Sequence, residues 1–223
     1  MHRLAETFFN WDVMARYAPN ILQGTWITIQ LALAIVVAGI AAGLVLAVLR
    51  TLRVAAVNAL IVLVVDVMRA LPPLVIIVIF YFALPTVGIK LSAWAATWLA
   101  LSLVLMAFAE EIFWAGILAV PQGQWEAARS TGLGSMQTLM NVVLPQAVRL
   151  TIAPLTNRTI AITKNTALGA VVALGEILYQ AQSAYSFSYN PSPLLLGAVA
   201  YLVLFIPVVY FGRWIETRFA WKR

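Results

Sequence analysis

Long apolar stretches divide this sequence, and each is long enough to cross a lipid bilayer, for which a helix needs about 20 mainly apolar residues. They cover residues 21–49, 54–85, 91–118, 144–164 and 194–214. The mean hydropathy of +0.95 indicates more apolar surface than a single soluble core could bury. We therefore expect an all-α integral membrane protein with five transmembrane helices, surrounded by the lipid bilayer.

The basic residues predict the direction in which these helices cross the membrane, because cytoplasmic loops carry an excess of lysine and arginine. An N-terminus outside the cytoplasm assigns eight basic residues to the cytoplasm and three to the outside. We therefore expect residues 1–20 to form an extracytoplasmic segment and residues 21–217 a single transmembrane domain. The loop 119–143 and a tail, residues 218–223, would be cytoplasmic. The cytoplasmic set is Arg50, Arg53, Arg129, Arg149, Arg213, Arg218, Lys222 and Arg223, and the outer set is Arg3, Arg16 and Lys90.

The composition and the lack of known catalytic patterns argue against several classes of function. The chain has no cysteine and one histidine, His2, so we expect no metal site. The basic residues are scattered between apolar stretches instead of gathering with aromatic residues on one face, so we expect no nucleic-acid partner. Because the sequence contains no GxxxxGK[ST], HExxH or GxSxG pattern, we expect no catalytic residue and no cofactor bound by this chain.

The stretch GQWEAARSTGLG, residues 123–134, is the least membrane-like segment in the interior of the chain. It can form about two to three helical turns, with Trp125 and Ala128 in one stripe and Glu126 paired with Arg129 on another. Its alanines present almost no side chain, so another protein could approach such a helix closely. The residue types alone leave two interpretations open, namely docking on a partner and lying flat at the membrane surface.

The spacing within and after this stretch resembles the EAA motif of ABC importer permeases, written EAA-x3-G-x9-I-x-L-P. Here it reads Glu126-Ala127-Ala128, then Gly132, then Val142-Val143-Leu144-Pro145, with Val142 at the usual isoleucine. Further segments resemble the polar amino acid branch of these permeases, which includes the histidine, glutamine and glutamate/aspartate transporters. They are Gly24 with Thr28, Arg69-Ala70-Leu71-Pro72, Phe108 to Ile117, Gly123-Gln124, Pro145-Gln146-Ala147 and Lys164-Asn165-Thr166-Ala167-Leu168.

The resemblance implies a type I ABC importer permease fold, also called MetI-like, as a multi-pass protein of the bacterial inner membrane. It implies that the EAA loop forms a coupling helix that docks on a cytoplasmic ABC ATPase dimer, where ATP and Mg²⁺ are bound. It also implies a second permease copy or a homologous permease, and a periplasmic or extracytoplasmic amino-acid-binding protein. The residues expected to contact the ATPase are Trp125, Glu126, Ala127, Ala128, Arg129, Gly132 and Leu133.

The chain departs from this branch in its membrane segments. RALPP stands at residues 69–73 where members usually have Arg-Gly-Thr-Pro-Leu, and KNTAL stands at residues 164–168 where they have Lys-Asp-Thr-Ser-Leu. Phe108 and Trp114 stand where tyrosine and arginine are common. Because the coupling loop keeps the motif, the resemblance supports import of polar amino acids or related small solutes more than it supports any single solute.

Polar residues inside the apolar stretches are candidates for a solute path. A charged side chain at the bilayer centre costs at least about 2.5 kcal/mol, so it normally faces a bundle interior or an aqueous path. We expect Asp66, Arg69, Arg158, Lys164 and Asn165 to line the path. For Asp66 and Arg69, which lie one helical turn apart, an ion pair without any role in solute binding is an equally good interpretation.

Four further residues are expected to have gating or structural roles. Glu110 and Glu111 lie close to the cytoplasmic end of the third apolar stretch, and their side chains point about 100° apart on a helix. Pro72 and Pro73 follow Arg69 closely and should break the hydrogen bonds of that helix.

A second class of function remains open on the residues alone. A secondary transporter or channel, driven by an ion gradient and without an ATPase partner, could use the same charges. The EAA spacing favours the ATP-driven importer. A membrane scaffold without transport activity would explain the loop but would leave the charges inside the apolar stretches without a purpose.

Overall fold

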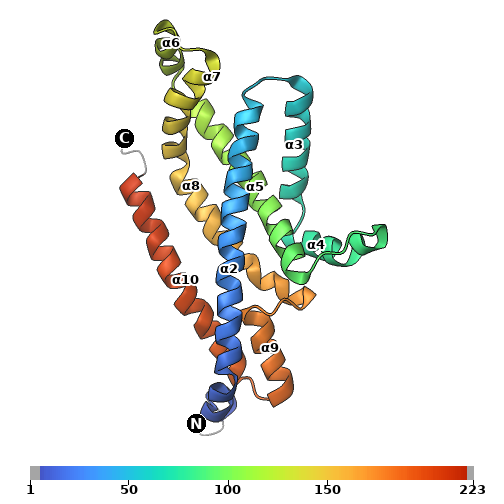
Figure 1. Ribbon diagram of the computed structural model, residues 1–223. Helices are drawn as coiled ribbons and strands as arrows, with labels where there is room; N and C mark the ends of the chain where they lie inside the picture. Colours follow the sequence, from blue (N-terminus) through green and yellow to red (C-terminus); the bar gives the residue numbers. More distant parts are fainter. Residues whose placement is uncertain (1–5, 220–223) are drawn as a thin grey trace. The chain divides into compact units, whose positions relative to one another are not determined.

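The computed structural model describes residues 6–219, and all regular secondary structure in this part of the chain is helical (Figure 1). The expectations for His2, Arg3, Lys222 and Arg223 fall outside the described residues, as do the outermost parts of both terminal segments.

The described residues form two compact units, and each has its own packing. The first unit consists of residues 6–37, 71–102 and 161–210. The second unit consists of residues 38–70, 103–160 and 211–219.

Helical stretches of membrane-spanning length dominate the structure. Within residues 6–219, four are long and apolar enough to cross a membrane: Glu6–Arg50, Ala93–Ala119, Ser135–Val172 and Ser192–Phe219. A fifth candidate is the pair Ala55–Ala70 and Pro73–Val87, which is interrupted at the two residues between them. The expected all-α membrane architecture is confirmed, with five spans when the interrupted pair counts as one. The direction of crossing stays a prediction.

The interruption lies where the sequence has two consecutive prolines. Helix α3 (Ala55–Ala70) ends before them, and α4 (Pro73–Val78) begins at Pro73, after Pro72 with φ −58° and ψ 133°. Proline lacks the N–H that a helix requires, and its ring disfavours a helical backbone in the residue before it. The helix break expected just beyond Arg69 is therefore present.

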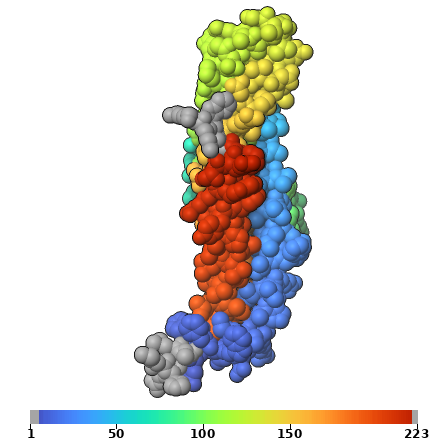
Figure 2. Space-filling view, turned by 90° about the vertical axis from the view of Figure 1, so that its left-hand side faces the viewer, coloured from blue at the N-terminus to red at the C-terminus, as the bar shows by residue number. Residues whose placement is uncertain are grey.

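The first unit is held together by short contacts between segments far apart in the sequence. A Cβ at Gly24 of α2 would lie 2.9 Å from the backbone carbonyl carbon of Glu176. Thr28 accepts a hydrogen bond from the Ile177 N–H at 3.4 Å. The Asn10 N–H donates to Ser192 Oγ at 2.9 Å, where the N-terminal segment meets the start of α10 (Figure 2). The unit contains parts of α2 (Trp11–Arg50), α5 (Ala93–Ala119) and α10 (Ser192–Phe219), together with α4, η1 (Ile79–Ala83), η2 (Leu84–Val87), η4 (Asn165–Val172) and α9 (Ile177–Ser188).

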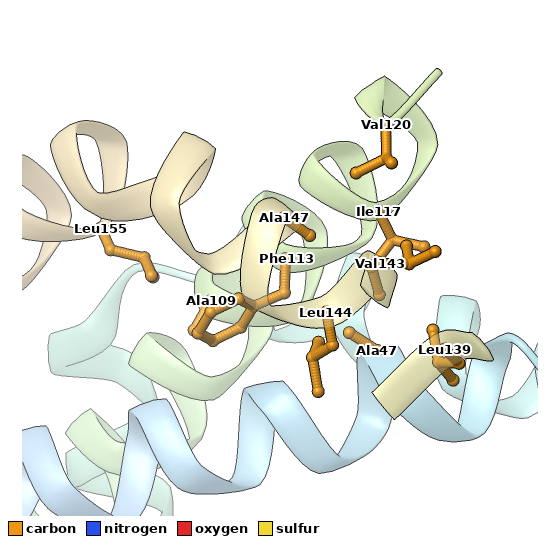
Figure 3. Close-up of a cluster of buried hydrophobic side chains, with 10 residues drawn as sticks. All are labelled: Ala47, Ala109, Phe113, Ile117, Val120, Leu139, Val143, Leu144, Ala147 and Leu155. Atoms are coloured by element: carbon orange, nitrogen blue, oxygen red, sulfur yellow. The ribbon is translucent and has the colours of Figure 1, made fainter. Parts of the chain in front are cut away.

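The second unit is built on a core between the remaining parts of α2, α5 and α8 (Figure 3). Helix α3 runs back beside the end of α2 (Figure 1), and Leu46 of α2 packs against a small buried cluster formed by Ile61, Val65 and Ala107. The buried members of the main core are Ala47, Ala109, Phe113, Ile117, Val120, Leu139, Val143, Leu144, Ala147 and Leu155. The unit also contains α6 (Gln122–Ser130), α7 (Ser135–Thr138), η3 (Leu139–Val143) and most of α8 (Leu144–Lys164).

Glycine allows α2 and α5 to approach each other closely in the second unit. A Cβ at Gly43 would lie 2.6 Å from the Cβ of Ala109 and 2.8 Å from the backbone nitrogen of Glu110. Since the second of these atoms belongs to the backbone, no side-chain movement could relieve the overlap. This contact fixes where the α5 glutamates stand relative to the end of α2.

Among the described residues, η1 and η3 are π-helical turns. In each, the leucine after the turn donates its N–H to the carbonyl of the turn's first residue, and a proline follows that leucine. These prolines, Pro85 and Pro145, cannot donate the backbone hydrogen bond that a regular α-helix would require of them. The wider turn therefore stands directly ahead of the position where α-helical bonding fails.

Candidate functional site

Helix α6, in the expected coupling loop, is nine residues long and has well-defined ends. Pro121 precedes it with φ −55° and ψ 137°. Gly132 follows it with φ +89°, and the Gly132 N–H donates to the Arg129 carbonyl at 2.9 Å. This left-handed conformation favours glycine because a Cβ would be strained there. The glycine of the EAA spacing therefore stands where the backbone turn requires one.

One face of α6 packs on its own unit, and the other is exposed. Trp125 packs against the core of Figure 3, and Ala128 is only 7% exposed. Glu126, Ala127 and Arg129 are exposed, on the short helix labelled α6 in Figure 1. Trp125 and Ala128, both expected to contact the ATPase, thus lie on the inner face, while Glu126 and Ala127 can be reached from outside.

The expected pair between Glu126 and Arg129 does not form in the structure. Glu126 accepts a hydrogen bond from the Gln122 side chain at 3.0 Å, one helical turn earlier. Arg129 instead donates to Ser135 Oγ at 3.2 Å. Because Ser135 begins α7, this bond fastens α6 to the next helix across the turn at Gly132.

A cavity of about 700 Å³ lies beside α6 within the second unit. Thr51 and Arg53, in the turn between α2 and α3, line it together with Trp114 of α5. Glu126 and Arg129 of α6 line it as well. The exposed face of α6 therefore borders this cavity, so the candidate docking surface is concave beside the helix.

The two adjacent glutamates of α5 bind different arginines in the second unit. Glu110 is fully buried, and its Oε1 lies 3.0 Å from Arg50 Nη1. Glu111 Oε2 lies 2.7 Å from Arg69 Nη2, whereas Asp66 lies 4.0 Å from Arg69. The predicted Asp66–Arg69 contact is therefore present but loose, and the sequence did not indicate the closer partner, Glu111.

Phe108, just before these glutamates on α5, is in contact with two arginines. The Arg158 guanidinium carbon is 3.7 Å from the centre of the Phe108 ring, and that of Arg69 is 5.4 Å away. Arg158 has no carboxylate within 4.0 Å among the described residues. Its charge therefore interacts with the Phe108 ring and with no carboxylate of this part of the chain. A similar contact joins Arg50 to Trp114 at 4.6 Å. The aromatic residues at 108 and 114 thus make cation–π contacts with three arginines.

Lys164 and Asn165 belong to the first unit, at the point where α8 passes into η4. Lys164 is exposed and Asn165 is half-buried. Lys164 forms no ion pair within the described part of the chain. These two expected path residues are therefore not part of the ion-pair cluster around Arg69 in the second unit.

A buried polar cluster that the sequence did not indicate surrounds Glu176. This residue caps α9, accepting hydrogen bonds from the N–H groups of Leu178 at 2.9 Å and Tyr179 at 2.7 Å. Tyr201 of α10 donates its hydroxyl to the same carboxylate at 2.5 Å. Burial raises the pKa of Glu176, although these hydrogen bonds act in the opposite direction. A lone glutamate at the start of an amphipathic segment was the signal that could have indicated this cap.

No group of three or more His, Cys, Asp or Glu side chains that could hold a metal ion occurs within residues 6–219. The second unit contains arginines, carboxylates and the short helix α6.

Sequence comparison finds relatives over nearly the full length of the chain. Residues 39–221 match the family described as binding-protein-dependent transport system inner membrane component. The probable glutamine ABC transporter permease protein GlnP of Bacillus subtilis (strain 168) is 34% identical over 215 residues, covering 93% of this chain and 99% of that protein. The L-cystine transport system permease protein TcyB of the same organism is 33% identical over 177 residues, covering 79% and 76%.

Two solved structures resemble this chain. One is a crystal structure of an amino acid ABC transporter with histidines, with a TM-score of 0.84 and 29% identity, covering 92% of this chain and 96% of that chain. The other is the MetNI methionine ABC transporter in an inward-facing conformation, with a TM-score of 0.67 and 22% identity, covering 95% and 99%. At that identity the second likeness concerns the fold alone.

Proposed function

This chain belongs to the family of binding-protein-dependent transport system inner membrane components, and we propose that its solute is a polar amino acid or a related small molecule. It is a multi-pass membrane permease with the MetI-like fold expected from its sequence. The relatives described as glutamine and L-cystine permeases support an amino acid as the solute. So does the similar structure described as an amino acid ABC transporter with histidines.

A permease of this family works with an ATPase and a substrate-binding protein. We place ATP and Mg²⁺ on a cytoplasmic ATPase dimer and assign no catalytic residue to this chain. Family membership favours this mechanism over a secondary transporter or channel driven by an ion gradient.

Coupling to the ATPase runs through α6 in this proposal. The helix is anchored by Trp125 and Ala128 on its inner side, while Glu126 and Ala127 are exposed. A helix anchored in this way can transmit a displacement at its outer face to the core on which it packs. The docking surface would consist of the outer residues of α6 and the rim of the neighbouring cavity, and Trp125 would act by holding the helix in place.

The remaining geometry of the importer follows from this role. A loop that meets a cytoplasmic ATPase must be cytoplasmic, which requires the extracytoplasmic N-terminus that the basic residues favour. A second copy of this chain, or a homologous permease, would complete the solute path, and a periplasmic or extracytoplasmic amino-acid-binding protein would deliver the solute.

The charged residues of the second unit support a path at its surface. The side chains of Asp66, Glu111 and Arg69 are 66%, 47% and 33% exposed within this chain. Charges at membrane depth rarely face lipid, so these side chains would face water or the second permease.

The exposed outer face of a firmly anchored α6 is the observation that carries the proposal. It is tested by purifying the tagged chain in mild detergent, identifying the proteins that co-elute, and measuring uptake of a panel of amino acids in proteoliposomes containing the complex. We expect an ATPase to co-elute and uptake to require ATP. Transport by the purified chain alone, without ATP, would overturn the assignment in favour of an ion-gradient-driven transporter.

A further inference from the structure

The ion pairs of the second unit leave Arg158, an arginine deep within a membrane segment, without a carboxylate among the described residues. Arg50 is neutralised by Glu110 at 3.0 Å, and Arg69 by Glu111 at 2.7 Å. Arg158 has no such partner among the described residues, although it lies about 20 Å along the helix from Pro145, well inside the fourth span. Since an unpaired charge at this depth is costly, its retention calls for an anion that the chain itself does not supply.

The stacking of Arg158 on Phe108 leaves its hydrogen-bonding groups free. A guanidinium is planar, and its N–H donors point outward in that plane, while its faces have no donors. At 3.7 Å, the ring of Phe108 covers one face and fixes the plane. Arg158 is partly exposed, so an incoming carboxylate could accept two parallel hydrogen bonds from the edge of the guanidinium.

Arg69 cannot serve in the same way without giving up its existing partner. Its guanidinium is engaged by Glu111 and lies near Asp66. A solute carboxylate approaching Arg69 would meet these two negative charges, whereas one approaching Arg158 meets none in direct contact. The anion-binding role therefore falls to Arg158.

We infer that Arg158, oriented by Phe108, makes the solute path selective for charge, so that it takes anionic amino acids of the dicarboxylate type and rejects cationic ones. The inference rests on the proposed function, because it assumes that the charged surface of the second unit lines the path. Beyond the proposed function, it specifies the charge of the solute and names Arg158 as the residue responsible for that selectivity.

The test measures equilibrium binding of labelled glutamate, glutamine and arginine to the detergent-purified permease–ATPase complex without the binding protein, so that selectivity reports on this chain. We expect glutamate to bind more tightly than arginine. Arg158→Gln should weaken glutamate binding about tenfold or more, as expected for losing a charge-assisted hydrogen bond. Arg158→Glu should reverse the preference in favour of arginine.

Arg149→Gln is the matched control, because Arg149 is an exposed arginine of the same helix without an ion pair among the described residues. It should leave glutamate binding unchanged. Equal loss in the two Gln variants, or unchanged binding in Arg158→Gln, would overturn the inference. If the Arg158 variants fail to assemble, the unmodified complex still tests the inference. Arginine binding to that complex as tightly as glutamate would contradict it. Failure of the proposed function would look different: no ATPase would co-elute, or uptake would not need ATP.

Discussion

Glu110 and Glu111 are neighbours on α5, yet Glu110 pairs with Arg50 at the end of α2 and Glu111 with Arg69 at the end of α3. Consecutive residues of a helix point about 100° apart, so one short segment can bind two different helices. The two pairs differ in burial, because Glu110 is fully buried and Glu111 is 47% exposed. They tie α2, α3 and α5 together within the second unit.

This difference in burial predicts unequal effects when each glutamate is replaced by its uncharged analogue. Glu110→Gln leaves Arg50 as an uncompensated, mostly buried charge and should cost roughly 3 kcal/mol of stability. Glu111→Gln should cost less, because Arg69 is more exposed and keeps Asp66 nearby. The measurement is the apparent unfolding temperature of the detergent-solubilised variants. A larger fall for Glu111→Gln than for Glu110→Gln would contradict this ranking.

The turn after α6 should be sensitive to loss of its glycine. Gly132 has φ +89°, where a residue with a Cβ is less stable by about 1–2 kcal/mol, although nothing lies within 4 Å of the position such an atom would take. Gly132→Ala should therefore reorient or loosen α6 and reduce the amount of ATPase that co-purifies. Gly123→Ala is the control, because Gly123 also has open space around it and its φ is not in the left-handed range. Equal ATPase recovery from both variants would remove the coupling role from this turn.

The crossing direction can be tested with single cysteines, since the chain has none. Ser130 at the end of α6 and Ser186 in α9 are both exposed. An impermeant thiol reagent added to intact cells should label Ser186→Cys and spare Ser130→Cys. Labelling of both after the membrane is opened serves as the control for accessibility. The opposite pattern would place the N-terminus in the cytoplasm and the α6 loop outside.

The Glu176 cluster predicts a specific loss of stability in the first unit. Tyr201→Phe removes the hydroxyl donor from a buried carboxylate and should cost roughly 1–3 kcal/mol. Tyr210→Phe is the matched control on the same helix, because Tyr210 is 66% exposed. Comparing the unfolding temperatures of the two variants measures the contribution of the hydroxyl. A fall of the same size in both would mean that Tyr201 contributes only its ring.

Features set by local sequence were predictable. The apolar stretches indicated the spans, and Pro72-Pro73 indicated where α3 ends, because chain length and the missing proline N–H act within one segment. The turn at Gly132, just after α6, obeys the same kind of local rule, because its positive φ favours glycine. The family also followed from local spacing, because the EAA motif lies within one loop and the start of the next helix.

Features set by helix packing were not predictable. The pairing of Arg69 with Glu111 joins residues 42 positions apart, and it depends on how α3 and α5 are rotated about their axes. The same rotation places Arg158 on Phe108 and turns Trp125 inward. The rotation of each helix about its axis cannot be read from a single sequence. The proposal that Arg158 receives the solute carboxylate therefore depends on partners that the sequence did not show.

The π-helical turn η3 overlaps the segment between Gly132 and Val142, whose length is part of the EAA motif. The length of this segment has a geometric consequence. Such a turn closes its hydrogen bond over one residue more than an α-helical turn does, and each residue of a helix advances the chain by about 100° around the axis. Residues 135–143 are helical and lead into α8, so their number sets the angle around the α8 axis at which the turn toward α6 leaves. Deleting one residue there should turn the outer face of α6 away from the ATPase that we propose it contacts, although every side chain of that face is retained. The spacing of the motif thus determines the orientation of α6, and the proposed docking surface depends on this spacing as much as on Glu126 or Ala127.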